Sequence, residues 1–358
     1  MALRLSLERY RLLGRSGLRV SPLALGTMTF GTQWGWGSDP DEAHRVFSTY
    51  IDRGGNFIDT ANQYTNGVSE ELIGKFATGL RDRLVIATKY TLTSDANNPN
   101  SGGNHRKSMR LSVETSLKRL ATDHIDLLYL HAWDFTTGPD EILRAMDDLV
   151  RCGKVLYIGI SNTPAWRVAR MQVISDMRGW SPLVALQVKY NLTERSAERD
   201  LLPMAVELGL GVLPWSPLAE GILAGKYIRK SGGNAQFETS QESLRKEVLL
   251  TDGSLTERIL GISVVVGEIA DELERSPAQV ALAWILLDPR ITSPIIGART
   301  LEQLKDNLGS LEVEFTQSQR HRLDSASAIE LGYPHDYLRS LMESSYMGIA
   351  TRVGPASS

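Results

Sequence analysis

The sequence predicts an α/β fold, a closed (β/α)8 barrel of the TIM type, with an open doubly wound sheet as the alternative. Helical patterns alternate with short apolar segments, which is typical of parallel strands joined by crossover helices. The segments number eight, as a closed barrel requires, and they lie near 23–26, 57–59, 84–88, 126–130, 155–160, 184–188, 210–214 and 293–297.

Local signals support the first predicted helix. Asp39 is a candidate N-cap, Pro40 suits the first helical position, and Glu42 has a spacing that resembles a capping box. An apolar stripe follows and ends at Gly54-Gly55. We interpret this stripe as the side of a crossover helix that faces the core.

The chain is longer than a barrel alone requires. It has 358 residues, whereas a (β/α)8 barrel needs about 250. The surplus is expected in an N-terminal β-hairpin around 14–20, in a long polar loop after strand seven at about 226–260 that could serve as a lid, and in a C-terminal tail. We expect residues 10–325 to form a single barrel domain and residues 326–358 to form the tail, which partly borders the substrate and ends in flexible residues.

Composition excludes several classes of function. A net charge of −3 gives no electrostatic reason to expect a nucleic acid or a membrane surface as partner. The chain has one cysteine, no cleavable signal pattern at its start, and no run of about 18 apolar residues. These features predict a cytoplasmic protein whose partner is a small molecule, and they leave a homo-oligomer open.

Polar residues end several of the predicted strands. Asp59, Lys89 and His131 each follow an apolar run, and Tyr64 stands five residues after Asp59. Because barrel active sites gather at the carboxyl ends of the strands, we expect these four side chains to meet. Together they form the candidate catalytic group.

The chemistry of these residue types favours protonation of a carbonyl oxygen. A phenol with a pKa near 10 is a weak acid at neutral pH, and a nearby ammonium should lower that pKa. Lys89 would be that ammonium, with Asp59 as its counter-ion, and His131 could hydrogen-bond the carbonyl oxygen. Since none of these groups supplies electrons, a reduction requires a hydride donor such as a nicotinamide cofactor.

The usual nucleotide and metal motifs are missing from the sequence. No G-x-G-x-x-G follows a strand, and neither H-E-x-x-H nor a cysteine cluster suggests a metal. Barrels often bind phosphates after strands seven and eight. Thr300 and Gln303 predict a helix N-terminus there, and Arg299 lies beside it, which together suit an anion.

The chain resembles the aldo-keto reductase superfamily over nearly its whole length, from Gly26 to Asn307. The resemblance rests on Asp59-Thr60-Ala61 with Tyr64, Lys89, Leu130-His131, Gly159-Ile160-Ser161-Asn162, Gln187-Val188-Lys189-Tyr190-Asn191, Trp215-Ser216-Pro217-Leu218 and Ile296-Gly297-Ala298-Arg299. It implies a (β/α)8 barrel and NADPH-dependent reduction of an aldehyde or ketone. Tyr64 is the implied proton donor, supported by Lys89 and Asp59, with His131 orienting the carbonyl.

The resemblance also implies a cofactor site. Ser161, Asn162 and Gln187 should bind the nicotinamide amide, and Trp215 should stack on its ring. The remaining implied contacts are Gly26, Thr27, Met28, Ser216, Leu218, Gly221, Gly297, Arg299, Gln303, Asp306 and Asn307. Gln303 stands where many members have arginine, and Gly297 where some have lysine. NADPH is therefore the expected cofactor, and use of NADH remains open.

Aromatic residues after the early strands suggest the substrate site. Trp34, Trp133 and Tyr90 are the candidates, because an aromatic wall suits a carbonyl carried on an apolar or sugar-like body. The tail at Tyr333 to Tyr337 is a further candidate wall.

Two other functions are compatible with the same residues. Some similar barrels are cofactor-binding regulatory subunits of potassium channels, and those proteins keep the catalytic residues. A lyase that uses Lys89 as a Schiff-base nucleophile is the second alternative, although it would leave the cofactor segments unexplained.

Overall fold

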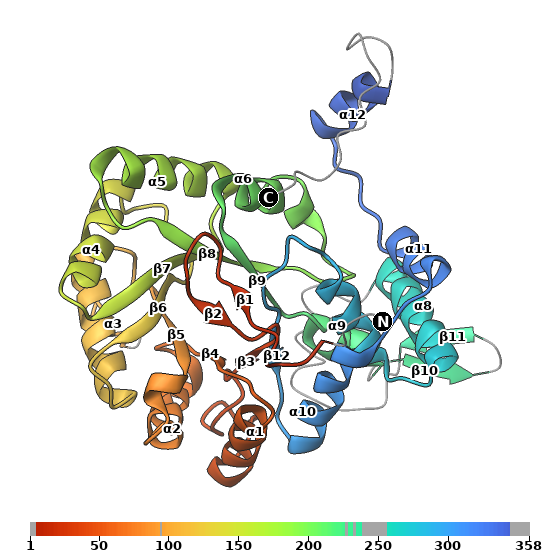
Figure 1. The fold of residues 1–358 in the computed structure, drawn as a ribbon, viewed down its shortest axis with the longest axis horizontal. Coiled ribbons are helices and arrows are strands. Elements are labelled where there is room, and N and C mark those ends of the chain that lie inside the picture. Colours follow the sequence, from red (N-terminus) through yellow and green to blue (C-terminus); the bar gives the residue numbers. More distant parts are fainter. Residues whose placement is uncertain (1–4, 94, 226–227, 232–233, 238–255, 344–358) are drawn as a thin grey trace.

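The barrel prediction is confirmed. The computed structural model describes residues 5–93, 95–225, 228–231, 234–237 and 256–343. Its main sheet has eight parallel strands in the order β12-β3-β4-β5-β6-β7-β8-β9 (Figure 1). The strands are β3 Ala24–Gly26, β4 Phe57–Asp59, β5 Val85–Tyr90, β6 Ile125–Leu130, β7 Val155–Ser161, β8 Leu183–Lys189, β9 Gly211–Trp215 and β12 Ile295–Gly297.

The barrel is nearly closed between its first and last elements. β12, the last barrel strand in the sequence, pairs in parallel with β3, the first barrel strand. On the other side of β12, Val212 of β9 forms an isolated parallel bridge with Ile291, and the Thr292 N–H donates to the Val212 carbonyl at 2.9 Å. An open doubly wound sheet is therefore excluded.

Helices surround the strands (Figure 1). The α-helices are α1 Pro40–Asp52, α2 Val68–Phe76, α3 Arg106–Arg119, α4 Pro139–Arg151, α5 Ala165–Arg178, α6 Leu201–Leu208, α8 Glu257–Leu273, α9 Pro277–Leu286, α10 Leu301–Leu308, α11 Gln317–Ala326 and α12 His335–Glu343. Short 3₁₀ helices cover η1 Tyr64–Gly67, η2 Arg81–Arg83, η3 Ser196–Glu198, η4 Ala219–Ala224 and η5 Gly309–Glu312.

The start of α1 is capped largely as its sequence predicts. The Asp39 carboxylate accepts a hydrogen bond from the Glu42 N–H at 2.9 Å. The Glu42 side chain was expected to complete a capping box, but its carboxylate accepts from the Leu301 N–H at 2.6 Å. It therefore links α1 to the N-terminus of α10, where a negative charge is favoured.

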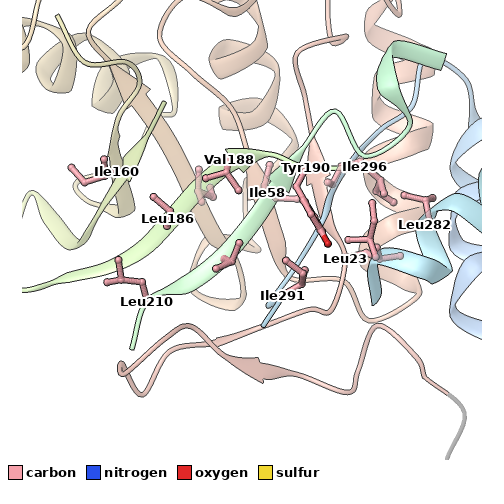
Figure 2. Close-up of a cluster of buried hydrophobic side chains, with 14 of the residues drawn as sticks. Leu23, Ile58, Ile160, Leu186, Val188, Tyr190, Leu210, Leu282, Ile291 and Ile296 are labelled. Carbon is pink, nitrogen blue, oxygen red and sulfur yellow. The ribbon is translucent and has the colours of Figure 1, made fainter. Parts of the chain in front are cut away.

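The core has two layers because neighbouring strand residues face opposite sides of the sheet. Inside the barrel, Phe57, Ala87 and Leu213 belong to one buried cluster. Between strands and helices, Ile58, Ile160 and many others form a larger cluster, part of which is shown in Figure 2.

The predicted N-terminal hairpin closes the amino end of the barrel. It consists of β1 Arg11–Leu12 and β2 Arg19–Val20, and its side chains Leu13 and Val20 join the inner cluster. Gly14 has a φ of +57°, and a Cβ there would lie 2.5 Å from the Val184 carbonyl oxygen, so the turn approaches β8 as only glycine allows.

The segments outside the barrel differ from expectation. The stretch predicted as a polar loop contains an antiparallel hairpin of β10 Ile228–Ser231 and β11 Asn234–Phe237, while residues 226–227, 232–233 and 238–255 lie outside the described residues. In the tail, α12 projects away from the barrel (Figure 1), and residues 344–358, including the end expected to be flexible, are not described. No helix within the described ranges has the length and apolar character needed to cross a bilayer.

Tyr50 provides a test of how α1 is fixed to the barrel. Its buried hydroxyl donates to the Leu23 carbonyl at 2.8 Å and lies 3.1 Å from the Phe57 carbonyl. We expect Tyr50→Phe to lower the free energy of unfolding by about 1–2 kcal/mol in urea denaturation, because buried acceptors lose their donor. Tyr10→Phe is the control, since it removes one bond from an exposed tyrosine. Equal stability of the two variants would contradict this role.

Candidate active site

Strand geometry brings three of the four predicted catalytic residues to one end of the barrel. Asp59 is two residues after the inward-facing Phe57, and Lys89 is two residues after the inward-facing Ala87. His131 follows Tyr129 by the same interval. Because side chains alternate along a strand, all three point into the barrel at its carboxyl end.

Tyr64 comes from a turn after β4. The turn is η1, in which Thr65 and Asn66 have φ values of +47° and +59°. The Thr65 hydroxyl holds this conformation by donating to the Phe30 carbonyl at 2.7 Å, and it accepts from the Ser69 N–H at 3.0 Å. The turn thereby directs the phenol of Tyr64 toward the strand ends.

A buried ion pair lies at the centre of the group. Lys89 Nζ is 2.5 Å from Asp59 Oδ1, and both side chains are at most 3% exposed. The ammonium also donates to the Thr60 carbonyl at 2.8 Å and to the Tyr64 hydroxyl at 3.2 Å. Gln187 donates to the second oxygen of Asp59 at 2.8 Å. Each N–H of the ammonium and each oxygen of Asp59 therefore has a partner.

Lys89 is held in its charged form by its partners, and Tyr64 is held in its protonated form by burial. Burial acts to lower the pKa of Lys89, but the Asp59 carboxylate and Tyr64 outweigh it, and the pKa is raised. Burial raises the pKa of Tyr64, and Lys89 opposes that rise without cancelling it. The sequence-based expectation of a lowered pKa is therefore wrong in net direction, although Lys89 acts as expected. A charged Lys89 is a poor nucleophile, which argues against the Schiff-base lyase.

His131 is neutral at physiological pH. Burial, and then the charge of Lys89, lower the pKa of His131 to about 3. Its ring meets the ring of Tyr64 edge-on, with centroids 6.1 Å apart. A neutral imidazole beside the phenol can hydrogen-bond an oxygen without adding a second positive charge next to Lys89.

A cavity of about 900 Å³ opens over this group. It lies at the carboxyl ends of the strands and has the size of a ligand site. The predicted residues that line it are Gly26, Met28, Trp34, Asp59, Tyr64, His131, Asn162, Gln187, Trp215, Ser216, Leu218, Gly221, Gly297, Arg299, Gln303, Asp306 and Asn307. Lys89 is fully buried and contacts Tyr64 from beneath.

Besides Lys89, four predicted site residues lie outside this lining. Thr27 is buried, and its hydroxyl bonds the Asp59 carbonyl at 3.0 Å. Ser161 is also buried, with no partner for its hydroxyl among the described residues. The Tyr90 hydroxyl is 3.5 Å from the Asn104 carbonyl, and Trp133 packs under Arg167. The geometry argues against substrate contact by Tyr90, because that side chain is fully buried on the face opposite to Lys89.

The tail residues at Tyr333 to Tyr337 do not line the cavity either. Tyr333 is 86% exposed and Tyr337 is 56% exposed. The linker before α12 is held on the barrel surface, where Arg199 donates to the Glu330 carbonyl at 2.9 Å. In the described structure this part of the tail therefore forms no wall of the cavity, and its closure over the pocket stays a prediction.

The far half of the cavity, which is lined by Asn162, Trp215, Gly221, Gly297 and Arg299, suits a dinucleotide. Asn162 accepts from the Trp215 indole N–H at 3.1 Å, which fixes both side chains at the cavity wall. Gly221 has a φ of +100°, in the left-handed region that favours glycine. A Cβ on Gly297 would meet no atom within 4 Å, so Gly297 leaves room for a ligand. The Arg299 guanidinium lines the same region and forms no ion pair with another described residue.

Some lining residues were not predicted. They include Gln63, Leu92, Glu220, Ala224 and Ala278. Gln63 adjoins Tyr64 in sequence, which is a usable signal. Ala224 and Ala278 carry no chemical signal, because only packing of η4 against α9 brings them to the cavity.

Comparison with known proteins places the chain in a family. The model of the Aldo/keto reductase family matches residues 22–328. Norsolorinic acid reductase of Aspergillus flavus is 36% identical and covers 94% of this chain and 86% of its own length. The uncharacterized oxidoreductase YrpG of Bacillus subtilis is 41% identical, covering 85% of this chain and 91% of its own length. Aryl-alcohol dehydrogenase (NADP(+)) of Phanerodontia chrysosporium is 37% identical, over 89% and 86% respectively.

The family match and the relatives cover the strands that carry the candidate group. Residues 22–328 include all eight barrel strands and the turn with Tyr64. The chain therefore belongs to the aldo-keto reductase family and is an NAD(P)H-dependent oxidoreductase.

Proposed function

We propose that this protein reduces an aldehyde or ketone with hydride from NADPH, and that Tyr64 donates the proton. The observation that carries the proposal is the Tyr64 hydroxyl in a cavity wall, 3.2 Å from the buried ammonium of Lys89. Carbonyl reduction is the activity that family membership supports, and the reverse reaction would oxidise an alcohol.

Each catalytic residue has a distinct part in this proposal. NADPH, when bound, supplies the hydride to the carbonyl carbon. Tyr64 transfers its proton to the carbonyl oxygen, and Lys89 stabilises the resulting phenolate. Asp59 holds Lys89 in its charged form. His131, neutral because of burial, donates a hydrogen bond that orients the carbonyl oxygen.

The far half of the cavity would bind the dinucleotide. Asn162 and Gln187 offer amide groups for the carboxamide, and Trp215 offers a ring for stacking on the nicotinamide. Arg299 provides the cation for the 2′-phosphate, with Gln303, Asp306 and Asn307 nearby on α10. One relative carries NADP(+) in its name, which supports this choice of cofactor.

Aromatic carbonyl compounds are the proposed substrate class. Trp34 and Trp36 line the cavity with ring centroids 5.7 Å apart, and Trp34 meets the Tyr64 ring edge-on at 6.4 Å. Trp34 is held by a hydrogen bond from its indole to Asn66 at 3.3 Å. A planar aryl group can pack against this aromatic wall while its carbonyl reaches Tyr64. Relatives named aryl-alcohol dehydrogenase support the same class.

The direct test is reduction of nitrobenzaldehyde, followed by loss of NADPH absorbance. The wild-type protein should turn over, and Tyr64→Phe should lower kcat by about 100-fold or more, because the general acid is gone. Binding of NADP+ should be unchanged, since the ring remains. Undiminished turnover in Tyr64→Phe would remove the proton-donor assignment, and no turnover by the wild type with any carbonyl would remove the proposed activity.

The pKa shifts predict opposite pH dependence in the two directions. Reduction needs protonated Tyr64, so its kcat should stay flat near neutrality and fall as pH rises through the raised pKa of Tyr64. Alcohol oxidation needs the phenolate, so its rate should rise with pH. His131 should add no acid limb near its ordinary pKa, since its pKa is about 3. Initial rates in both directions between pH 5 and about 10 would check this: the reduction rate should stay flat over this range, because the pKa of Tyr64 is raised above its ordinary value and the fall lies at still higher pH. A reduction rate that increases with alkaline pH would contradict it.

Arg299 should decide the preference for NADPH. We expect Arg299→Ala to raise the Kd for NADP+ by about 10-fold or more, the effect of losing a hydrogen bond to a charged group. The Kd for NAD+ should change little, because that molecule lacks the 2′-phosphate. Quenching of tryptophan fluorescence measures both. Lys305→Ala is the matched control, since Lys305 is a cation of α10 that pairs with Glu302 outside the cavity. Equal losses for both cofactors would contradict the role of Arg299.

A further inference from the structure

Glu70 is a fully buried carboxylate outside the catalytic group. It lies on α2, between the turn that carries Tyr64 and the outer face of β5. Burial raises its pKa, and hydrogen bonds from Ser116 and Thr88 together with the charge of Arg119 oppose that rise. Burying a charged carboxylate costs free energy unless its oxygens are paired, so the partners of both oxygens of Glu70 are important for the structure.

One oxygen of Glu70 is bound to the strand that carries Lys89. The Thr88 hydroxyl donates to Glu70 Oε1 at 2.7 Å. Thr88 directly precedes Lys89, and alternation along β5 turns Thr88 outward where Lys89 turns inward. Glu70 therefore holds β5 from behind at the position next to the catalytic ammonium.

The other oxygen of Glu70 leads to the turn that carries Tyr64. Arg119, the last residue of α3, places its Nη1 3.2 Å from Glu70 Oε2 and donates to the Asn62 carbonyl at 2.8 Å. Its guanidinium also covers Gly67, where a Cβ would lie 2.2 Å from Arg119 Cζ. Asn62 and Gly67 stand on either side of Tyr64 in the chain, so Arg119 contacts both ends of its turn.

The packing of α2 on α3 sets this arrangement. At Gly74, one turn after Glu70, a Cβ would lie 2.5 Å from the Arg119 carbonyl oxygen. The two helices are thus in close contact where Arg119 leaves α3. Any residue with a Cβ at position 74 would require the two helices to shift.

We propose that Glu70 and Arg119 form a clamp that positions Tyr64 against Lys89 from outside the cavity. The clamp connects Lys89, through Thr88 and Glu70, to Arg119 and the turn of Tyr64. It makes Glu70 and Arg119 positioning residues that act through the 3.2 Å contact between the Tyr64 hydroxyl and Lys89 Nζ. The inference rests on the proposed role of Tyr64 as proton donor.

Glu70→Gln tests the clamp, because it keeps the bond from Thr88 and removes the charge that faces Arg119. We expect kcat for carbonyl reduction to fall about 10-fold, since small displacements of a catalytic group reduce rate strongly. The KM for the carbonyl compound and the Kd for NADP+ should stay within about twofold, because neither Glu70 nor Arg119 lines the cavity. Arg119→Lys should give the same split. The double variant should lose no more than about either single variant, as members of one unit do.

A second readout does not need turnover. The pKa of Tyr64 can be followed by ultraviolet difference titration, with the signal identified by its loss in Tyr64→Phe. We expect this pKa to be higher in Glu70→Gln, because a less closely held ammonium stabilises the phenolate less. This titration separates the two hypotheses: inactivity of the wild type would refute the reductase function, whereas an unchanged pKa of Tyr64 would refute the clamp.

Asp147→Asn is the matched control for a structural effect. Asp147 is also a buried carboxylate, paired with Arg151 and bound by Ser181 at 2.9 Å, but it lies on α4 and outside the cavity lining. Both variants should lower the thermal midpoint, and only Glu70→Gln should change kcat. A folded Glu70→Gln with wild-type kcat, or equal kcat losses in both variants, would overturn the proposal. If Glu70→Gln does not fold, Thr88→Val removes the bond to β5 and must show the same split.

Discussion

The active site depends on one buried ion pair, that of Lys89 and Asp59. An ammonium without access to water is costly unless every N–H is bound, and here the three donors reach Asp59, Thr60 and Tyr64. The second oxygen of Asp59 is bound by Gln187 of β8. Satisfying one charge therefore fixes the relative positions of β4, β5, β8 and the turn after β4, and the place of Tyr64 follows from it.

Much of this site could be predicted from the sequence because it depends on strand ends. Asp59, Lys89 and His131 each end an apolar run, and a barrel brings such ends together. Two of the predicted residues lie outside the cavity lining, because nearness in sequence does not ensure nearness in space. Tyr90 adjoins Lys89, yet alternation places it on the other face of β5. Thr27 adjoins Gly26, but its hydroxyl is already bound to backbone and to Ser69.

Other features could not be predicted because they depend on several distant elements. The net pKa of Tyr64 is decided by burial against the charge of Lys89, and the sequence does not report the extent of burial. The hairpin of β10 and β11 has loop composition and depends on cross-strand pairing. From the sequence alone, Glu70 cannot be distinguished from an exposed acidic residue on a helix. Only the contact between α2 and α3 reveals that it is buried.

The N-terminal hairpin has a consequence for the direction from which ligands reach the cavity. Leu13 and Val20 fill the amino end of the barrel, and the turn at Gly14 lies against the backbone of β8. Ligands must therefore enter and leave by the carboxyl face, where one cavity is lined by Tyr64 and Arg299 alike. Cofactor and carbonyl compound would therefore approach the proposed site from the same face of the barrel, and the hairpin at the opposite end sets that direction of approach.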